Sequence, residues 1–276
     1  MSGLVFAAIA PHGSMAIDEA CEPEEKDLAK ATQDAFVELG RRFEAARPDA
    51  TIVLTPHSVH VDGAFAAVIS AELHGSLSEW TTQPLELTCP VDRDLALRTV
   101  ISLNDAGIPT VGLSYGGNDP ETAVFPMDWG ALIPLWYMGG RAEPPVPAVV
   151  VSPARDRSFE EHVRAGAVLA QAAADSGRRV ALIASADHGH AHDADGPYGY
   201  DPAAKEYDDR VVELVRSERL RELLEFNPTF IERAKADSFW QMLMLHGALG
   251  DRWRGKLLSY EAPTYFGMLC AAYAPL

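Results

Sequence analysis

The stretch that decides the fold is the apolar run LVFAAIA at residues 4–10, which a proline ends. A run of this length without charges is typical of a strand that is buried on both faces of a sheet. Similar runs occupy residues 51–55, 148–152 and 179–185, and helix-like segments separate them. Strands that alternate with helices predict an α/β fold, with a largely parallel or mixed central sheet and helices on both faces.

The segments between these runs have helical periodicity. The strongest pattern covers residues 24–47, between two prolines, and carries an apolar stripe at helical spacing. Other helices are expected at 92–106, 128–138 and 158–176, other strands at 65–71, 110–115 and 257–260, and a final apolar helix after them. Because no repeat or persuasive linker interrupts the chain, residues 1–276 are interpreted as one domain.

The composition excludes several classes of partner. The chain is 47% hydrophobic and 23% charged, with a formal net charge of −17. Such an acidic surface repels nucleic acid and anionic membranes, so neither is expected as a partner. No apolar stretch approaches the ~18 residues of a membrane span. The three cysteines show no paired spacing, which favours the reduced cytoplasm over a disulfide framework.

Histidines follow two of the predicted strands directly. His12 stands after the run 4–10, and His57 stands after the run 51–55, each behind a proline. In an open α/β sheet the carboxyl ends of the strands form one rim, where ligands bind. Each histidine alone would be interpreted as a hydrogen-bonding group at a strand end. The repeated Pro-His turn favours metal ligation, since histidine is the commonest biological metal ligand.

A third strand leads into the polar segment SADHGHAHD at residues 185–193. Its three histidines at alternate positions are consistent with a metal cluster, or with one catalytic acid/base and hydrogen-bonding neighbours. Glu261 follows the predicted strand 257–260. An isolated glutamate there is more often a helix-start residue. With His12 and His57, however, it would complete the two-histidine, one-carboxylate set that holds Fe(II).

In the order of these motifs the chain resembles the class III extradiol ring-cleavage dioxygenases, the superfamily of the β subunit of protocatechuate 4,5-dioxygenase. The shared features are the early Pro-His turn, the second strand-end histidine, a Ser-x-Asp-x-x-His segment at 185–190 and a late glutamate. The resemblance implies that His12, His57 and Glu261 ligate Fe(II). It implies that His190 is the catalytic acid/base, with His188 as the competing assignment.

The same resemblance implies a substrate and partners. The expected reaction inserts both atoms of O2 into a small catechol-like or aminophenol-like aromatic. A homo-oligomer is expected, and the sequence leaves open whether a small companion subunit is needed, as in some relatives.

The chain departs from its relatives at one position of the expected pocket. Many relatives carry Asp-His-Gly where this chain has Asp128-Trp129-Gly130. An indole can only donate a hydrogen bond, so Trp129 is expected either to form an apolar wall of the pocket or to pack in the core. His60, three residues after His57, is a candidate to supply the missing polar group, and His192 is a further candidate pocket residue.

Two other functions fit part of the sequence. A zinc or dinuclear metallohydrolase would use the 187–193 cluster, although the order of its residues differs from that of the metallo-β-lactamases. A Memo-like protein would share the fold of the superfamily and bind a metal or a partner without catalysis. The presence of His12, His57, His190 and Glu261 together favours the enzyme.

Overall fold

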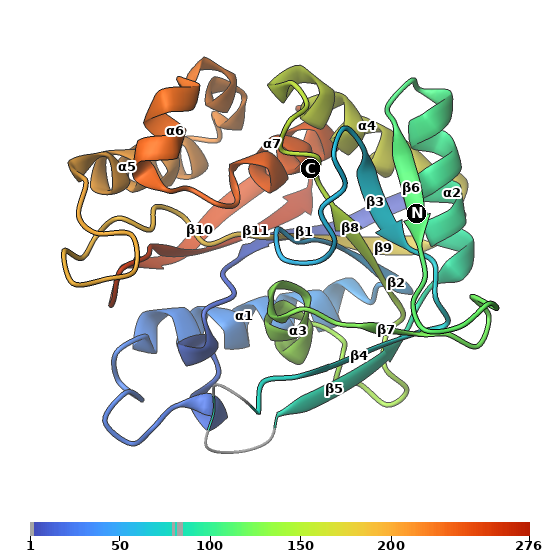
Figure 1. Cartoon of the computed structure of the whole chain (residues 1–276), viewed down its shortest axis with the longest axis horizontal. Helices are drawn as coiled ribbons and strands as arrows, with labels where there is room; N and C mark the ends of the chain where they lie inside the picture. Colours follow the sequence, from blue (N-terminus) through green and yellow to red (C-terminus); the bar gives the residue numbers. More distant parts are fainter. Residues whose placement is uncertain (1–2, 79–80, 82–84) are drawn as a thin grey trace.

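The four apolar runs form the centre of an eight-stranded sheet in the computed structural model, which describes residues 3–78, 81 and 85–276 (Figure 1). In sheet order they are β1 (Gly3–Ala10), β9 (Arg179–Ser185), β2 (Ala50–Leu54) and β8 (Ala148–Ser152), and they run parallel. Every residue of β2 and β8 is buried. This burial explains why β2 and β8 contain no charges, since both faces of these strands are covered.

Antiparallel pairing at both ends makes the sheet mixed. On one side, β11 (Met268–Pro275) pairs with β1 and β10 (Trp253–Glu261) pairs with β11, both antiparallel. On the other side, β3 (Phe65–Val68) pairs antiparallel with β8, and β6 (Thr110–Leu113) pairs parallel with β3. The α/β class with a mixed central sheet is therefore confirmed.

Helices cover both faces, as predicted. The helices α1 (Lys30–Ala46) and α3 (Trp129–Tyr137) lie on one face (Figure 1). The opposite face carries α2 (Arg93–Asp105), α4 (Phe159–Asp175) and α7 (Phe239–Leu249). The remaining helices are α5 (Pro202–Arg216), α6 (Pro228–Ala234) and the short 3₁₀ segments η1 (Ser14–Ala16), η2 (Asp18–Ala20) and η3 (Leu220–Glu225).

Two expectations for secondary structure need correction, and one small sheet was not expected. The final apolar helix is wrong, because residues 268–275 form strand β11 between β1 and β10. A fully apolar run has no period that separates a buried strand from a buried helix, and here two neighbouring strands supply its hydrogen bonds. The helix predicted from residue 24 begins at Lys30, after a series of turns. A small second sheet of β4 (Glu72–Ser76), β5 (Glu86–Pro90) and β7 (Val124–Pro126) was not predicted.

Close packing of α4 against α7 fixes the position of α7. A Cβ atom added at Gly166 would lie 1.8 Å from the carbonyl oxygen of Met244, and one at Gly247 would lie 1.9 Å from that of Val163. Only glycine permits such an approach of two helix backbones. The connection between α6 and α7 therefore has a rigid anchor on its carboxyl side.

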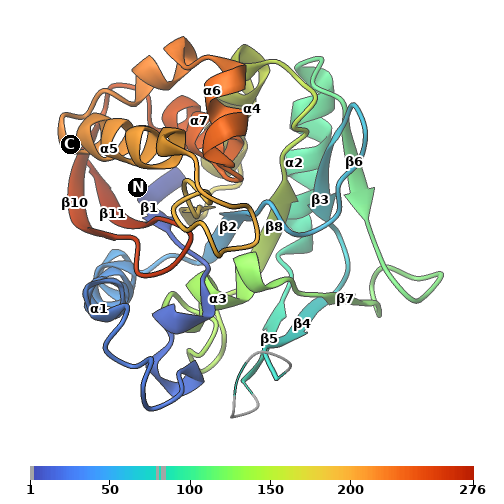
Figure 2. The ribbon, with the colours of Figure 1, turned by 60° about the vertical axis from the view of Figure 1, so that its left-hand side comes forward.

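The carboxyl ends of β1, β9 and β2 lie next to one another at one edge of the sheet. Figure 2 shows α5 and α6 on one side of this edge and α1 and α3 on the other. Among the described residues, no helix combines the length and the apolar character that a membrane span requires.

Candidate metal centre

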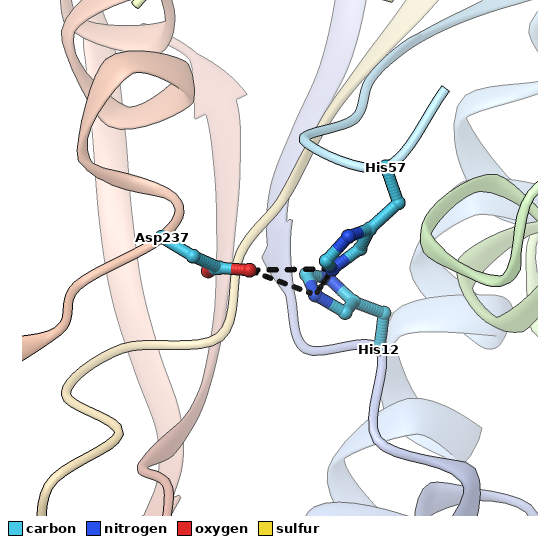
Figure 3. Close-up of side chains that lie close together, drawn as sticks. All are labelled: His12, His57 and Asp237. Carbon is cyan, nitrogen blue, oxygen red and sulfur yellow. Dashed lines mark hydrogen bonds and ion pairs between the residues drawn. The ribbon is translucent and has the colours of Figure 1, made fainter. Parts of the chain in front are cut away.

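Three side chains converge at this edge of the sheet: His12, His57 and Asp237 (Figure 3). The Nε2 atoms of the two histidines are 2.9 Å apart. The Oδ2 atom of Asp237 lies 3.2 Å from Nε2 of His57 and 3.8 Å from Nε2 of His12. The structure thus joins the two strand-end histidines, as expected, but with a different carboxylate.

The chemistry of this cluster fits a divalent first-row metal ion. Two imidazoles and one carboxylate form the set typical of mononuclear non-haem Fe(II) sites, which leave positions open for other ligands. The second ring nitrogen of His12, Nδ1, lies 2.9 Å from Oγ of Ser185, so Nε2 is the nitrogen directed at the cluster. Metal-binding histidines characteristically use their other nitrogen in such a hydrogen bond.

The end of β9 holds His12 in place. The backbone N–H of His12 donates to Oδ1 of Asp187 at 2.9 Å, and Oδ2 of Asp187 lies 3.3 Å from Nε2 of His12. Burial lowers the pKa of His12, but the carboxylates of Asp187 and Asp237 raise it, and the net shift is upward. The site is therefore electrostatically negative, which favours a bound cation.

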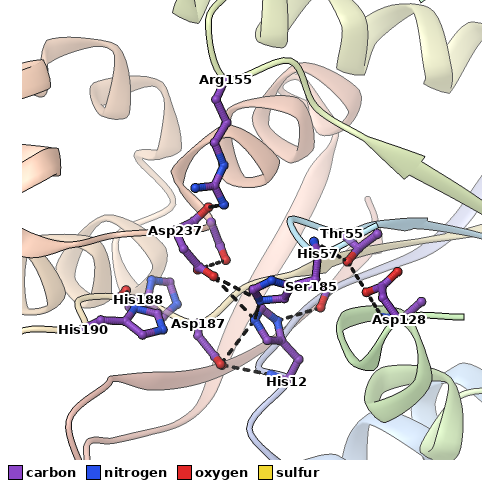
Figure 4. A network of polar contacts seen from close by, with 12 residues as sticks. His12, Thr55, His57, Asp128, Arg155, Ser185, Asp187, His188, His190 and Asp237 are labelled. Atoms are coloured by element: carbon purple, nitrogen blue, oxygen red, sulfur yellow. Dashed lines mark hydrogen bonds and ion pairs between the residues drawn. The ribbon is translucent and has the colours of Figure 1, made fainter. Parts of the chain in front are cut away.

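A chain of contacts on the other side orients His57 (Figure 4). Its backbone N–H donates to Oγ1 of Thr55 at 3.2 Å, and this hydroxyl donates to Oδ1 of Asp128 at 2.6 Å. Asp128 also caps α3, and burial raises the pKa of its carboxyl group. The indole of Trp129 stacks on the imidazole of His57, with ring centroids 4.2 Å apart at 28°. The start of α3 therefore fixes both the backbone and the ring of His57.

Asp237 comes from the connection between α6 and α7. Its carbonyl oxygen accepts a hydrogen bond from Nη2 of Arg155 at 2.7 Å. Burial raises the pKa of the Asp237 carboxyl, but hydrogen bonds from His12 and His57 outweigh it and hold the pKa well below its usual range. Sequence reasoning missed this residue because it searched strand ends, and Asp237 ends no strand. The available signal was an acidic residue two positions before the largely apolar helix 239–249.

Glu261, the expected carboxylate ligand, lies elsewhere. It ends β10, two strands away from β1 in the sheet. Its Oε1 atom accepts a hydrogen bond from the backbone N–H of Thr32 at 2.6 Å, in the first turn of α1. The residue before that helix, Ala29, has no side-chain acceptor, so Glu261 supplies the missing cap. In the candidate site Asp237 therefore takes the place assigned to Glu261.

The variant Glu261→Ala is expected to lower the free energy of unfolding by about 0.5–2 kcal/mol, the usual cost of losing a helix cap. Its metal content should match that of the unchanged protein, because the side chain is bonded to α1. Chemical denaturation and elemental analysis of the metal-loaded protein measure the two quantities. Loss of metal with unchanged stability would contradict the capping role.

A cavity of about 950 Å³ adjoins the three side chains, and His12, His57 and Asp237 form part of its wall. Much of the remaining wall is aromatic: Trp129, Phe159, Tyr198, Trp240, Tyr265 and Phe266. Trp129 therefore lies where the apolar-wall hypothesis requires it. Such a concave, largely apolar space with a few converging polar groups is typical of a small-molecule site.

His190 is the histidine of the 185–193 segment that lines this cavity. Its Nδ1 lies 2.8 Å from the carbonyl oxygen of His188. A carbonyl can only accept, so Nδ1 carries the proton and Nε2 of the neutral ring has the free lone pair. The ring also stacks on Phe266, with centroids 5.4 Å apart at 17°. Its orientation is thus fixed by contacts that leave the basic nitrogen available.

The other candidate histidines lie outside this cavity in the described part of the chain. His188 is buried, neither ring nitrogen has a hydrogen-bond partner among the described residues, and burial lowers its pKa. His192 bonds through Nε2 to the buried carboxylate of Asp208 at 2.8 Å. His60 is exposed and lies 3.3 Å from Asp62. The expected pocket roles of His60 and His192 are therefore not supported. In the described structure the three histidines of 185–193 do not converge on one metal-binding position.

This combination of fold and site defines a class, and comparison with known proteins identifies it. The chain belongs to the family of the catalytic LigB subunit of aromatic ring-opening dioxygenases, which matches residues 6–269. The resemblance to the class III extradiol superfamily is thereby confirmed.

Two individual proteins are similar over most of the chain. Protein CA_C1420 of Clostridium acetobutylicum is 23% identical over 256 residues, which are 91% of this chain and 53% of that relative. The chain thus spans about half the length of this curated relative. The structure of the uncharacterized protein JW3007 from Escherichia coli K12 superposes with a TM-score of 0.64 and 18% identity, covering 97% of this chain and 99% of that one. This second likeness concerns the fold.

Proposed function

We propose that this chain is a non-haem Fe(II)-dependent extradiol dioxygenase, which opens a catechol-like or aminophenol-like ring with both atoms of O2. The observation that carries the proposal is the placement of His190 in the same cavity wall as the His12, His57 and Asp237 cluster. A metal site and an acid/base group are thereby offered to one bound molecule. Membership of the ring-opening family supports this reading over the metallohydrolase.

The roles of the residues follow from their contacts. His12, His57 and Asp237 would hold the iron, which when bound supplies open positions for two adjacent substrate heteroatoms and for O2. The aromatic walls, among them Trp129, hold a flat ring and exclude water from it. Nε2 of His190 accepts a proton from a substrate hydroxyl and returns it later in the reaction. Acid/base groups of this kind contribute about 10²–10⁴-fold to rate.

Oxygen consumption tests the proposal directly. The protein is reconstituted with Fe(II) under anaerobic conditions. It is then mixed with air-saturated solutions of catechols or aminophenols, while O2 uptake and ring-opened products are measured. Stoichiometric, substrate-dependent O2 uptake is expected. A protein that binds iron stoichiometrically but consumes no O2 with any of these compounds would instead favour the Memo-like, non-catalytic alternative.

The variant Trp129→His is expected to change the ranking of aromatic substrates while iron content stays the same. The indole forms a cavity wall and stacks on His57, so a polar ring there favours substrates that can hydrogen-bond at that point. Pocket selectivity of this kind is worth about 1–3 kcal/mol, or roughly 10- to 200-fold in relative kcat/KM. Competition between paired substrates measures the ratio. An unchanged ranking would mean that Trp129 acts only in packing.

A further inference from the structure

Next to the segment 189–192, and outside the cavity lining, lies a carboxylate to which the proposed function assigns no role. Asp208 of α5 is fully buried. Its Oδ1 accepts a hydrogen bond from the backbone N–H of Gly189 at 2.7 Å. Its Oδ2 accepts from Nε2 of His192 at 2.8 Å and from the hydroxyl of Tyr260 at 2.7 Å. In the described part of the chain no lysine or arginine forms an ion pair with it, so these three donors compensate its charge.

The donors bracket His190 in the sequence. Gly189 directly precedes it and His192 follows by two residues, so one carboxylate holds the backbone before the catalytic candidate and a side chain after it. The opposite side of the segment is also held, because Gly267 accepts from the N–H of His188 at 2.9 Å and donates to the carbonyl of Gly189 at 3.0 Å.

Two glycines allow the carboxylate to come this close. A Cβ atom at Gly267 would lie 1.9 Å from Oδ2 of Asp208, and one at Gly189 would lie 2.9 Å from the backbone of Ala204 on α5. The segment therefore lies directly on α5. Hydrogen bonds to a buried carboxylate are strong and directional. Three of them can therefore fix a loop that has no regular secondary structure.

We propose that Asp208 is a positioning residue that holds His190 at the cavity, an inference that rests on the proposed acid/base role of His190. Asp208 contacts none of the three proposed metal ligands in the described structure. It acts on the reaction through the segment 189–192 alone. A displacement of about 1 Å at a catalytic group can cost about 100-fold in rate.

The test compares Asp208→Ala with Asp209→Asn in the iron-loaded protein. Asp209 is the next residue of α5, but it is exposed and pairs with Lys205, so its variant should leave activity unchanged. For Asp208→Ala we expect kcat to fall about 10- to 100-fold, with similar KM and iron content. Hydrogen exchange of the 189–192 amides should become faster in this variant, with or without metal.

The double variant with His190→Ala separates positioning from general loss of structure. If Asp208 acts through His190, then Asp208→Ala should change kcat by less than about threefold once His190 is absent, because residues that act as a unit are not additive. Full multiplication of the two effects would overturn the proposal. If Asp208→Ala does not fold, Asp208→Asn, which keeps an oxygen for Gly189, replaces it in every measurement, with the same non-additivity expected.

Hydrogen exchange distinguishes a failure of this inference from a failure of the proposed function. If the unchanged protein opens no ring, the dioxygenase proposal fails. Faster exchange at 189–192 in Asp208→Ala would still support the positioning role of Asp208. Unchanged exchange of that segment in Asp208→Ala would overturn the positioning role, whatever the activity of the protein.

Discussion

Replacing Asp237 with alanine is expected to remove tight Fe(II) binding. The variant keeps His12 and His57 but loses the anionic member of the proposed ligand set, a carboxylate that lies 3.2 Å from Nε2 of His57 and 3.8 Å from Nε2 of His12. Removing an outer-shell partner already costs about 10–100-fold in metal affinity, so removing a ligand should cost more than about 100-fold. Anaerobic titration with Fe(II), followed by elemental analysis after desalting, measures the affinity and the retained metal.

Two variants serve as controls for this prediction. Asp237→Asn keeps the shape and one oxygen but loses the charge, so it should bind iron more weakly than the unchanged protein and more tightly than Asp237→Ala. Glu261→Ala should bind iron normally. The reverse result, with iron retained in Asp237→Ala and lost in Glu261→Ala, would restore Glu261 as the ligand and refute the assignment made from the structure.

Replacing His190 with alanine is expected to reduce turnover by about 10²–10⁴-fold while the iron content stays near stoichiometric. The ring lines the cavity and its Nδ1 is occupied by the carbonyl of His188, so Nε2 is the group that is lost to the reaction. Single-turnover kinetics in parallel with metal analysis separate the two effects.

The matched control is His60→Ala, which removes an exposed imidazole outside the cavity and should leave both quantities unchanged. Loss of iron together with activity in His190→Ala would identify His190 as a ligand. That outcome would reopen the question of a histidine cluster in the 185–193 segment.

The parallel core of the sheet could be predicted from sequence because its strands are mostly apolar and end at polar turns. His12, His57 and the 185–193 segment follow three strands that are neighbours in the sheet, so the rule that such ends share one rim placed them together. The rule failed for the carboxylate. Glu261 also ends a strand, but that strand, β10, is the outermost one on its side of the sheet. Asp237 instead comes from the connection between two helices, which has no strand signal.

The different surroundings of the three histidines at 188, 190 and 192 could not be predicted from the sequence either. Alternate residues of an extended segment would point to the same side, yet His188 is buried, His190 faces the cavity and His192 turns to Asp208. Contacts with α5 and with residues 265–267 decide these directions. They are long-range packing contacts, which single-sequence patterns do not encode. For the same reason the sequence of residues 268–275 did not predict that they form a strand.

The positions of the proposed ligands along the chain have a consequence for biosynthesis. His12 and His57 leave the ribosome before Asp237, which follows 180 residues after His57 and is held in place by the packing of α7 against α4. A nascent chain therefore presents two imidazoles without their carboxylate while the 180 residues between His57 and Asp237 are made. Binding of the proposed iron is therefore expected to follow the docking of α7 on α4, which brings Asp237 to the two histidines.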